Sequence, residues 1–239
     1  MSALLTRGLL IAAVAHLCLA RSDVDAALIS YQQGVSGYAG TQDSDLVRLS
    51  PTANFSADID LELAGSGSFI RNSLIRFDDV FGNGSGQIPL GTAIASATLI
   101  LENIAPNPAP SLSLHRVLVD WDEATVTWNN FGSTPGGASG IDYSAVSTNT
   151  LTTGVLGPQS VDVSADVQLW ANGASNFGWY ILGQGAAING YASSEHGTLE
   201  FRPELVIEFV PEPSSMALCA IAAMTMAAGY RRGRRKRFG

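Results

Sequence analysis

The central part of this 239-residue chain contains no cysteine and no lysine. The two cysteines, Cys18 and Cys219, lie in apolar runs near the two ends, and the single lysine is Lys236. The central part therefore has no disulfide framework, no thiolate metal site and no cysteine nucleophile. Residues 28–210 include 18 acidic residues and five arginines, a net charge of −13, compared with −8 for the whole chain. Because an acidic surface repels phosphate backbones, nucleic acid is a poor candidate partner.

The N-terminus has the form of a secretory signal peptide. A single basic residue, Arg7, precedes an apolar run from Leu9 to Ala20, and small residues follow. About a dozen apolar residues are too few to span a membrane comfortably. Cleavage can fall after Ala20 or after Ala26, and we favour Ala26, which predicts a signal peptide over residues 1–26. A buried N-terminal helix is the alternative, and export is the working expectation.

Three features follow one another at the C-terminus: Pro211-Glu212-Pro213, an uncharged stretch over residues 214–230, and a basic cluster over residues 231–237. The 17 residues of the uncharged stretch, at ~1.5 Å each, give a helix of ~26 Å, at the short limit for a transmembrane helix. The stretch is rich in alanine, so we expect a weak membrane anchor. The basic cluster should stay in the cytoplasm, which places residues 28–210 outside. A basic tail that binds nucleic acid is the competing interpretation.

This three-part order resembles the PEP-CTERM sorting signal of bacteria, over residues 211–239. The resemblance implies that an exosortase, a membrane protease of the transpeptidase type, recognises Pro211, Glu212 and Pro213 and cuts near them. These three residues would be recognition residues, not catalytic ones. The protein would be a membrane-anchored precursor that is then released or transferred to the cell surface or extracellular matrix. Family members commonly occur in bacteria that make exopolysaccharide or biofilm.

Residues 27–210 alternate short strand-like segments with clusters of Gly, Ser, Asn and Pro. In residues 58–63, Ile59, Leu61 and Leu63 would lie on one face of a strand, because side chains alternate between the two faces. Further strands are predicted by the same period or by composition over residues 73–77, 97–102, 112–117, 160–163, 178–182 and 204–209. We predict an all-β jelly-roll sandwich of about eight to ten strands.

One short helix is predicted over residues 165–172. Ser164 is a suitable N-cap, Asp166 falls in the first turn, and Gly173 can take the left-handed conformation after the last turn. This helix would cover one end of the sandwich with Val167 and Trp170.

The order of several motifs along residues 27–210 resembles the DNRLRE, or disaggregatase-related, domain, which is similar to the jelly rolls of carbohydrate-binding modules. The name-giving Asp-Asn-Arg-Leu-Arg-Glu string is absent, and Arg71-Asn72-Ser73-Leu74 stands closest to it. The resemblance implies a polysaccharide-binding or structural surface protein. The motifs are, in order, residues 33–43, 73–78, 87–94 with 96–101, 121–128, 161–168, and 193–195 with 202–208.

Catalytic chemistry has little support between residues 28 and 210. His115 and His196 are the only histidines there, and no Gly-x-Ser-x-Gly or His-Glu-x-x-His motif occurs. We expect structural roles for both histidines and no enzymatic activity. A catalytic pair of carboxylates, as in glycosidases, is an open alternative, because the distance of ~5 to 10 Å between the two carboxyl groups cannot be read from a sequence. The alternative function is therefore a secreted polysaccharide hydrolase or lyase that uses carboxylates or His196.

Calcium is the metal that this composition favours. Calcium takes several oxygen ligands, and an extracellular domain rich in carboxylates and in Gly, Asn and Ser loops can supply them. Jelly rolls that resemble this one often carry a structural calcium. Asp43 and Asp45, at alternate positions after Gly40, are the first candidates, followed by Asp78 and Asp142. Surface carboxylates without a ligand are the competing interpretation.

Sugar binding requires aromatic platforms with a few polar groups. Core packing is the default for each of the four tryptophans, because large aromatic side chains are mostly buried in a sandwich. We expect exposed, ligand-binding aromatics in or next to predicted loops. The candidates are Tyr38, Trp121, Tyr143 and Tyr191.

Overall fold

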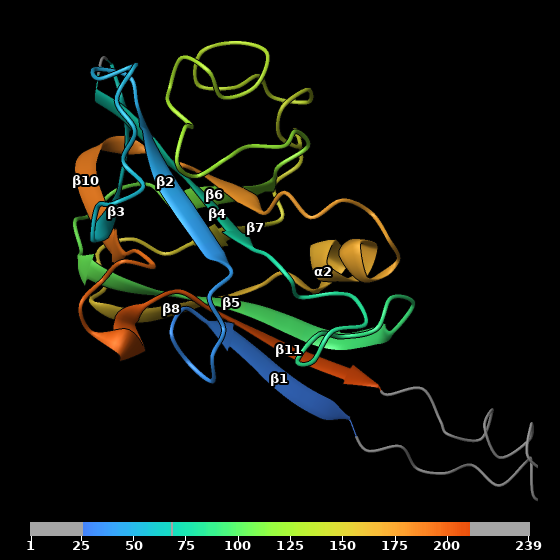
Figure 1. Cartoon of the computed structure of the whole chain (residues 1–239). Coiled ribbons are helices and arrows are strands. Elements are labelled where there is room, and N and C mark those ends of the chain that lie inside the picture. Colours follow the sequence, from blue (N-terminus) through green and yellow to red (C-terminus); the bar gives the residue numbers. More distant parts are fainter. Residues whose placement is uncertain (1–25, 68, 211–239) are drawn as a thin grey trace, which may run out of the picture. The chain divides into compact units, whose positions relative to one another are not determined.

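Eleven strands form the body of the computed structural model, which describes residues 26–67 and 69–210 (Figure 1). The strands are β1 (Ala27–Gln32), β2 (Thr41–Val47), β3 (Asp60–Ser66), β4 (Phe69–Phe77), β5 (Ala93–Ala105), β6 (Leu112–Arg116), β7 (Asn149–Leu151), β8 (Gly157–Asp162), β9 (Trp179–Leu182), β10 (Gly185–Ala192) and β11 (Glu204–Val210). One α-helix, α2 (Ser164–Ala171), and one 3-10 helix, η1 (Leu199–Phe201), complete the described elements.

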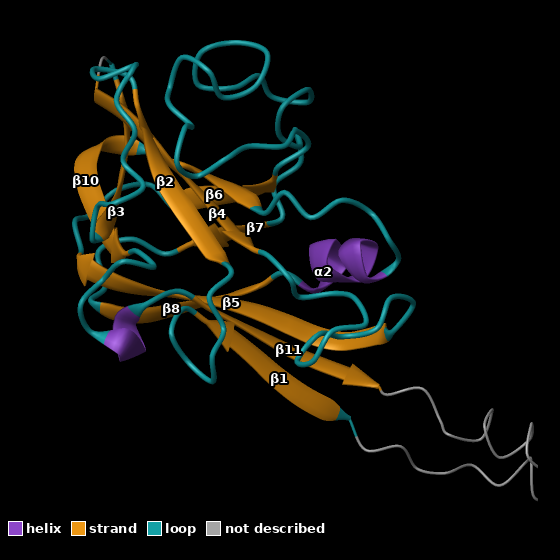
Figure 2. Ribbon diagram, viewed as in Figure 1, coloured by secondary structure: helices purple, strands orange, loops and turns teal. Residues whose placement is uncertain are grey.

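Antiparallel pairing connects all the strands into one sheet that folds over into two layers (Figure 2). One layer contains β2, β4, β9, β6 and β7, and the other contains β1, β11, β5, β10 and β3, with β8 beside β5. The layers join where Ala64–Ser66 pairs with Phe69–Arg71. The predicted all-β class is confirmed, and the eleven strands exceed the eight to ten expected.

In most of the predicted strands, the alternation of apolar and polar residues correctly indicated which side chains point into the core. Leu61 and Leu63 of β3 are buried as predicted. Ile59 precedes β3 and is 59% exposed, so its predicted place on the core face was wrong. Short or glycine-rich strands such as β7 and β10 have no such pattern, which is why they were not predicted.

The main core lies between the two layers, and aliphatic and aromatic side chains from both of them fill it. Trp170 of α2 packs there against Trp179 of β9, with ring centroids 4.8 Å apart. The core includes Tyr31, Leu61, Leu63, Ile75, Phe77, Leu99, Leu101, Leu114, Val167, Trp170, Trp179, Ile181, Tyr191, Leu205 and Ile207.

A second apolar cluster lies on the other face of the β2–β4–β9 layer. Residues 117–148, the long yellow-green connection between β6 and β7 in Figure 1, cover this face. The Tyr180 hydroxyl fixes the connection to the sheet, because it lies 2.7 Å from the carbonyl oxygen of Gly136. The members of the cluster are Leu46, Leu74, Val117, Trp121, Val126, Phe131 and Tyr180.

Helix α2 begins one residue earlier than predicted, and its capping differs. The N-cap is Val163, without a side-chain cap; the Ser164 hydroxyl instead contacts Asp162 and accepts from the Ala97 N–H at 2.8 Å. Gly173 is left-handed as predicted, with φ of +97°. Asp166 is buried and joins three elements: its carboxylate lies 3.2 Å from Arg116 Nε, accepts from the Trp179 indole at 3.0 Å, and accepts from the Thr148 hydroxyl.

No helix in the described part of the chain is long and apolar enough to cross a membrane. The predicted signal peptide, the Pro211-Glu212-Pro213 motif and the predicted membrane span all lie outside the described residues.

Candidate functional site

Three carboxylates from distant parts of the sequence meet at the edge of the sandwich. Asp43 lies on β2, Glu123 on the long connection, and Glu195 on the segment after β10. One carboxylate oxygen from each lies within 4.8 Å of the others. We call these three residues the carboxylate cluster.

Backbone hydrogen bonds at the edge of β2 hold the cluster together. Strand β2 pairs only with β4 among the described strands. The Asp43 N–H donates to Glu123 Oε1 at 2.8 Å, and Asp43 Oδ2 accepts from the Ser194 N–H at 2.8 Å. The Ser194 hydroxyl contacts both Glu195 oxygens at 2.9 Å. The cluster thus connects the long connection and the segment after β10 to a single strand.

The electrostatics of the cluster disfavour three negative charges. Asp43 is only 1% exposed, and burial, then Glu195, raise its pKa well above the ordinary value. Partial burial also raises the pKa of Glu123, although Arg76 acts in the opposite direction. A charged carboxylate removed from water without a cation is costly, so the cluster favours either bound protons or a bound cation.

The chemistry of these donors fits a hard divalent cation. Calcium takes six to eight oxygen ligands from carboxylates, carbonyls and water. Asp43, Glu123 and Glu195 would supply three of them. Cysteine and histidine are absent from the cluster, so a soft metal has no preferred ligand there.

The structure brings only one of the four predicted calcium ligands to this cluster. Asp45 points to the same side of β2 as Asp43 but accepts from the Glu62 N–H at 2.7 Å and from the Ser73 hydroxyl. Asp78 forms an ion pair with Arg76, with Nε and Oδ1 2.7 Å apart.

Asp142 is also occupied by the protein itself. Its Oδ2 accepts from the Ser133 hydroxyl at 2.8 Å and the Ala138 N–H at 2.7 Å. Burial raises the pKa of Asp142, but these hydrogen bonds outweigh it and leave the pKa below its ordinary value. Of the four candidate ligands, Asp43 lies in the carboxylate cluster, and Asp45, Asp78 and Asp142 lie outside it. Each of the last three is satisfied by its own neighbours.

Sequence reasoning missed Glu123 and Glu195 as members of the cluster. Both occur in motifs of the predicted domain, Trp121–Trp128 and Ser193–Glu195. They are separated from Asp43 by 80 and by about 150 residues, and only the pairing of the strands brings them to it.

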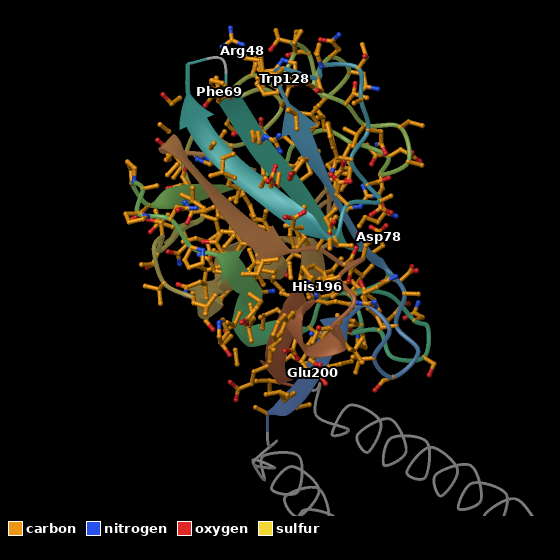
Figure 3. The ribbon with its side chains drawn as sticks, turned by 90° about the vertical axis from the view of Figure 1, so that its left-hand side faces the viewer. Arg48, Phe69, Asp78, Trp128, His196 and Glu200 are labelled. Atoms are coloured by element: carbon orange, nitrogen blue, oxygen red, sulfur yellow. The ribbon has the colours of Figure 1, made fainter. Side chains whose placement is uncertain are left out.

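The two histidines have local packing contacts. His115 is buried; its Nδ1 lies 2.8 Å from the Ser144 carbonyl oxygen, and its ring packs edge-on against Tyr143. His196 is partly exposed, its Nδ1 accepts from the Thr198 N–H at 3.1 Å, and its ring lies against Phe201. In Figure 3, His196 lies between Asp78 and Glu200, far from Trp128 at the opposite end. These contacts agree with the structural roles expected of both rings.

The predicted aromatic residues differ in exposure. Tyr191 is fully buried in the core and Trp121 is 6% exposed, so their predicted exposure was wrong. Tyr191 lies on β10, whose inward face is part of the core, and Arg76 packs over the Trp121 ring at 4.9 Å. Tyr143 belongs to the long connection itself and is half-buried against the second apolar cluster. Tyr38 is half-buried too, in the loop between β1 and β2.

The comparison with known families decides the class of the domain. The model of carbohydrate-binding module family 96 matches residues 41–209, which is more than half of the chain. The chain belongs to carbohydrate-binding module family 96. The matched region of this family 96 module runs from the first residue of β2 nearly to the end of β11, and it contains the whole carboxylate cluster. No curated protein matches the chain.

Family 96 membership confirms the coarser part of the predicted resemblance, a domain of the carbohydrate-binding kind. It suggests a non-catalytic binding domain.

Proposed function

We propose that this protein is an exported polysaccharide-binding protein of a bacterial cell surface or extracellular matrix. The observation that carries the proposal is the family 96 match over residues 41–209. The charge of the body disfavours binding to nucleic acid, because residues 28–210 contain 18 acidic residues and only five arginines.

The two ends of the chain support the export and sorting steps. Residues 1–26 have the form of a signal peptide, and residues 211–239 have the three-part order of a PEP-CTERM signal. In our proposal an exosortase recognises Pro211, Glu212 and Pro213 while residues 214–230 hold the precursor in the membrane. Cleavage then releases the module to the surface or matrix.

Affinity electrophoresis of the purified full-length chain tests the binding function. The gels would contain xylan or mixed-linkage glucan as neutral probes, and polygalacturonate or alginate as acidic ones. We expect retardation in at least one gel, with no release of reducing sugar after long incubation. Unretarded migration in every gel would overturn the proposal, and release of sugar would favour the alternative hydrolase or lyase.

We also propose that the carboxylate cluster binds calcium as a structural ion. The supporting observation is the meeting of three carboxylates, one of them fully buried, within 4.8 Å of one another. A cation there would neutralise Asp43 and fasten the long connection and the segment after β10 to β2. Its role would be to stabilise the fold, since bound ligands stabilise the state that binds them.

Thermal unfolding in EDTA and in millimolar CaCl2 tests the calcium proposal. Calcium should raise the midpoint of the wild-type protein by several degrees, since ~3 kcal/mol is expected when the ion is at 100 times its Kd. Glu123→Gln removes one charged ligand and should reduce this shift, whereas Glu102→Gln, outside the cluster, should keep it. Equal midpoints for the wild-type protein in EDTA and calcium would refute a calcium site.

A further inference from the structure

The first and last strands of the body meet at one end of the sandwich. Strands β1 and β11 are antiparallel, and Ala27 at the start of β1 pairs with Phe209 near the end of β11. The Ser96 hydroxyl of β5 lies 3.1 Å from Glu208 Oε2, so the first residues of β5 lie at the same end. In Figure 1, these strand ends lie on the side of the sandwich that carries α2.

Helix α2 and the segment before β5 complete this end. The Gly91 N–H donates to the Ala171 carbonyl oxygen at 2.8 Å, and the Ile94 N–H donates to Gln168 Oε1 at 2.9 Å. The helix and the start of β5 therefore form one continuous surface with the ends of β1 and β11. We call this surface the terminal end, and its members are residues 26–30, 89–97 and 164–174.

The terminal end carries almost no charge, although the body is strongly acidic. Asp166 is its one charged residue, and it is buried and paired with Arg116. Three of its leucines are exposed: Leu28 by 71%, Leu90 by 59% and Leu169 by 43%. Single exposed leucines are ordinary on a protein surface. Their position on an uncharged surface is not, because residues 28–210 contain 18 acidic residues.

The chain that follows β11 indicates what covers the terminal end. Strand β11 ends at Val210, and the uncharged stretch that is predicted to span the membrane begins at Ser214. A fully extended chain covers at most ~14 Å from Val210 to Ser214. The headgroup layer on each side of a bilayer is itself ~5–8 Å thick. In a precursor held by residues 214–230, the end of β11 therefore stays close to the lipid headgroups.

We propose that the terminal end docks on the lipid surface while the precursor is anchored, with Leu28, Leu90 and Leu169 inserted among the headgroups. This inference rests on the proposed export and membrane anchoring of the chain, and it adds a membrane-contact surface on the folded body. Apolar side chains on an uncharged surface suit the bilayer interface, because insertion removes them from water.

The rim of the terminal end indicates the kind of lipid surface. Asp162 precedes α2 and contacts Ser164, and Glu208 pairs with Leu28 across the β1–β11 ladder. These carboxylates would be repelled by an anionic lipid surface, so the terminal end suits zwitterionic headgroups. Docking would also direct the opposite end of the body away from the membrane. Figure 3 labels Arg48 and Phe69 at that opposite end, far from the blue strand β1.

Hydroxyl-radical footprinting of the chain in phosphatidylcholine vesicles tests the proposal. The chain is exported from a host without an exosortase, so that the signal peptide is removed and the C-terminal span is kept. The reference is Ala222→Arg/Ala223→Arg, whose two charges in the predicted span should keep it out of the bilayer. We expect the three leucines to be oxidised about threefold more slowly in the anchored wild-type chain than in the reference. Leu49 and Phe69, exposed by 57% and 62% at the opposite end, should be oxidised equally in both.

A second variant separates docking from simple closeness to the membrane. Leu90→Glu/Leu169→Glu introduces charges at two exposed positions, so the fold should be retained. We expect it to restore the oxidation of Leu28 to the rate of the reference, because charged side chains stay out of the bilayer interface. The matched control, Leu49→Glu/Phe69→Glu, should leave Leu28 protected. Thermal unfolding confirms that each variant is folded.

The outcomes distinguish docking from anchoring. If the wild-type chain floats with the vesicles but its three leucines are oxidised as fast as in the reference, docking is wrong and the anchor stands. Protection that grows with protein concentration and persists in the reference would mean that a second copy covers the terminal end, which overturns lipid docking. A wild-type chain that does not float with the vesicles would overturn the anchor and the docking together, and the polysaccharide-binding function would stand or fall by the affinity gels.

Discussion

Asp45 Oδ2 accepts a hydrogen bond from the backbone N–H of Glu62 at 2.7 Å, across the open edge of the sandwich. Asp45 lies on β2 of one layer and Glu62 on β3 of the other. Asp43, which precedes Asp45 by two residues on β2, likewise accepts a backbone hydrogen bond, from the Ser194 N–H after β10. Two buried carboxylates thus satisfy backbone donors where the two layers have no strand pairing. This explains why acidic side chains point inward on an edge strand.

Asp45→Ala should destabilise the protein by about 2–3 kcal/mol, because it leaves the half-buried Glu62 N–H and the buried Ser73 hydroxyl without an acceptor. Chemical denaturation of the full-length chain measures the loss. Asp58→Ala, on the exposed segment before β3, is the control and should change the free energy of unfolding by less than about 0.5 kcal/mol. Equal stabilities of the two variants would contradict the bridging role of Asp45.

In EDTA, the stability should fall as the pH rises from about 4 through neutrality. Burial raises the pKa of Asp43 and of Asp45 well above the ordinary value, so between the two pKa values the folded state binds more protons than the unfolded chain. Their contribution to stability is complete below the unfolded pKa and is lost as the pH rises through the folded one. Thermal midpoints at pH 5 and pH 7.5 measure the slope.

The double variant Asp43→Asn/Asp45→Asn should flatten this pH dependence. Calcium should flatten it as well if the ion binds at the carboxylate cluster, because the cation replaces the protons as the neutralising charge. A midpoint for the wild-type protein in EDTA that rises with pH from 5 to 7.5 would contradict the assignment of raised pKa values.

Asp166→Ala should cost about 2–4 kcal/mol, because it removes the buried partner of an ion pair whose arginine is half-buried, together with two hydrogen-bond acceptors. It leaves Arg116, Thr148 and the Trp179 indole without their shared acceptor. Urea unfolding followed by tryptophan fluorescence is suitable, because Trp179 reports directly on the site. Asp162→Ala removes an exposed carboxylate that contacts Ser164, so a loss of similar size there would argue against a special role of Asp166.

Tyr180→Phe should loosen the long connection by removing a buried hydroxyl. This hydroxyl accepts from the Asn72 amide at 2.6 Å and lies 2.7 Å from the Gly136 carbonyl oxygen. We expect a loss of about 1–3 kcal/mol and faster proteolytic cleavage within residues 117–148. Tyr143→Phe, at a half-buried residue that packs against the same cluster, should change both measurements less. Unchanged cleavage of Tyr180→Phe would show that apolar packing alone holds the connection.

Much of the fold could be predicted from local patterns. Leu61 and Leu63 were placed correctly because side chains alternate along any strand, whatever its partner. Helix α2 was predicted within one residue at each end, and Gly173 has the expected left-handed φ. These features depend on interactions between residues close in the sequence.

The candidate sites could be predicted only in part. Asp43 was named from the sequence, but its partners were not, since Glu123 and Glu195 lie 80 and about 150 residues away from it. Tyr191 was misplaced for the converse reason. Its neighbouring residues resemble a loop, whereas the pairing of β10 with β3 and β5 turns its ring into the core.

The sequence by itself determined the acidic, cysteine-free body, its strand periodicity and the distinct composition of its two ends, because composition and period are properties of the chain alone. Tertiary structure decided which carboxylates meet and which aromatic rings are buried. Those outcomes depend on strand order and register, which bring residues far apart in the chain within a few ångströms of one another. Asp43 was a candidate ligand on composition and position alone, and the strand order decided that Glu123 and Glu195 lie beside it.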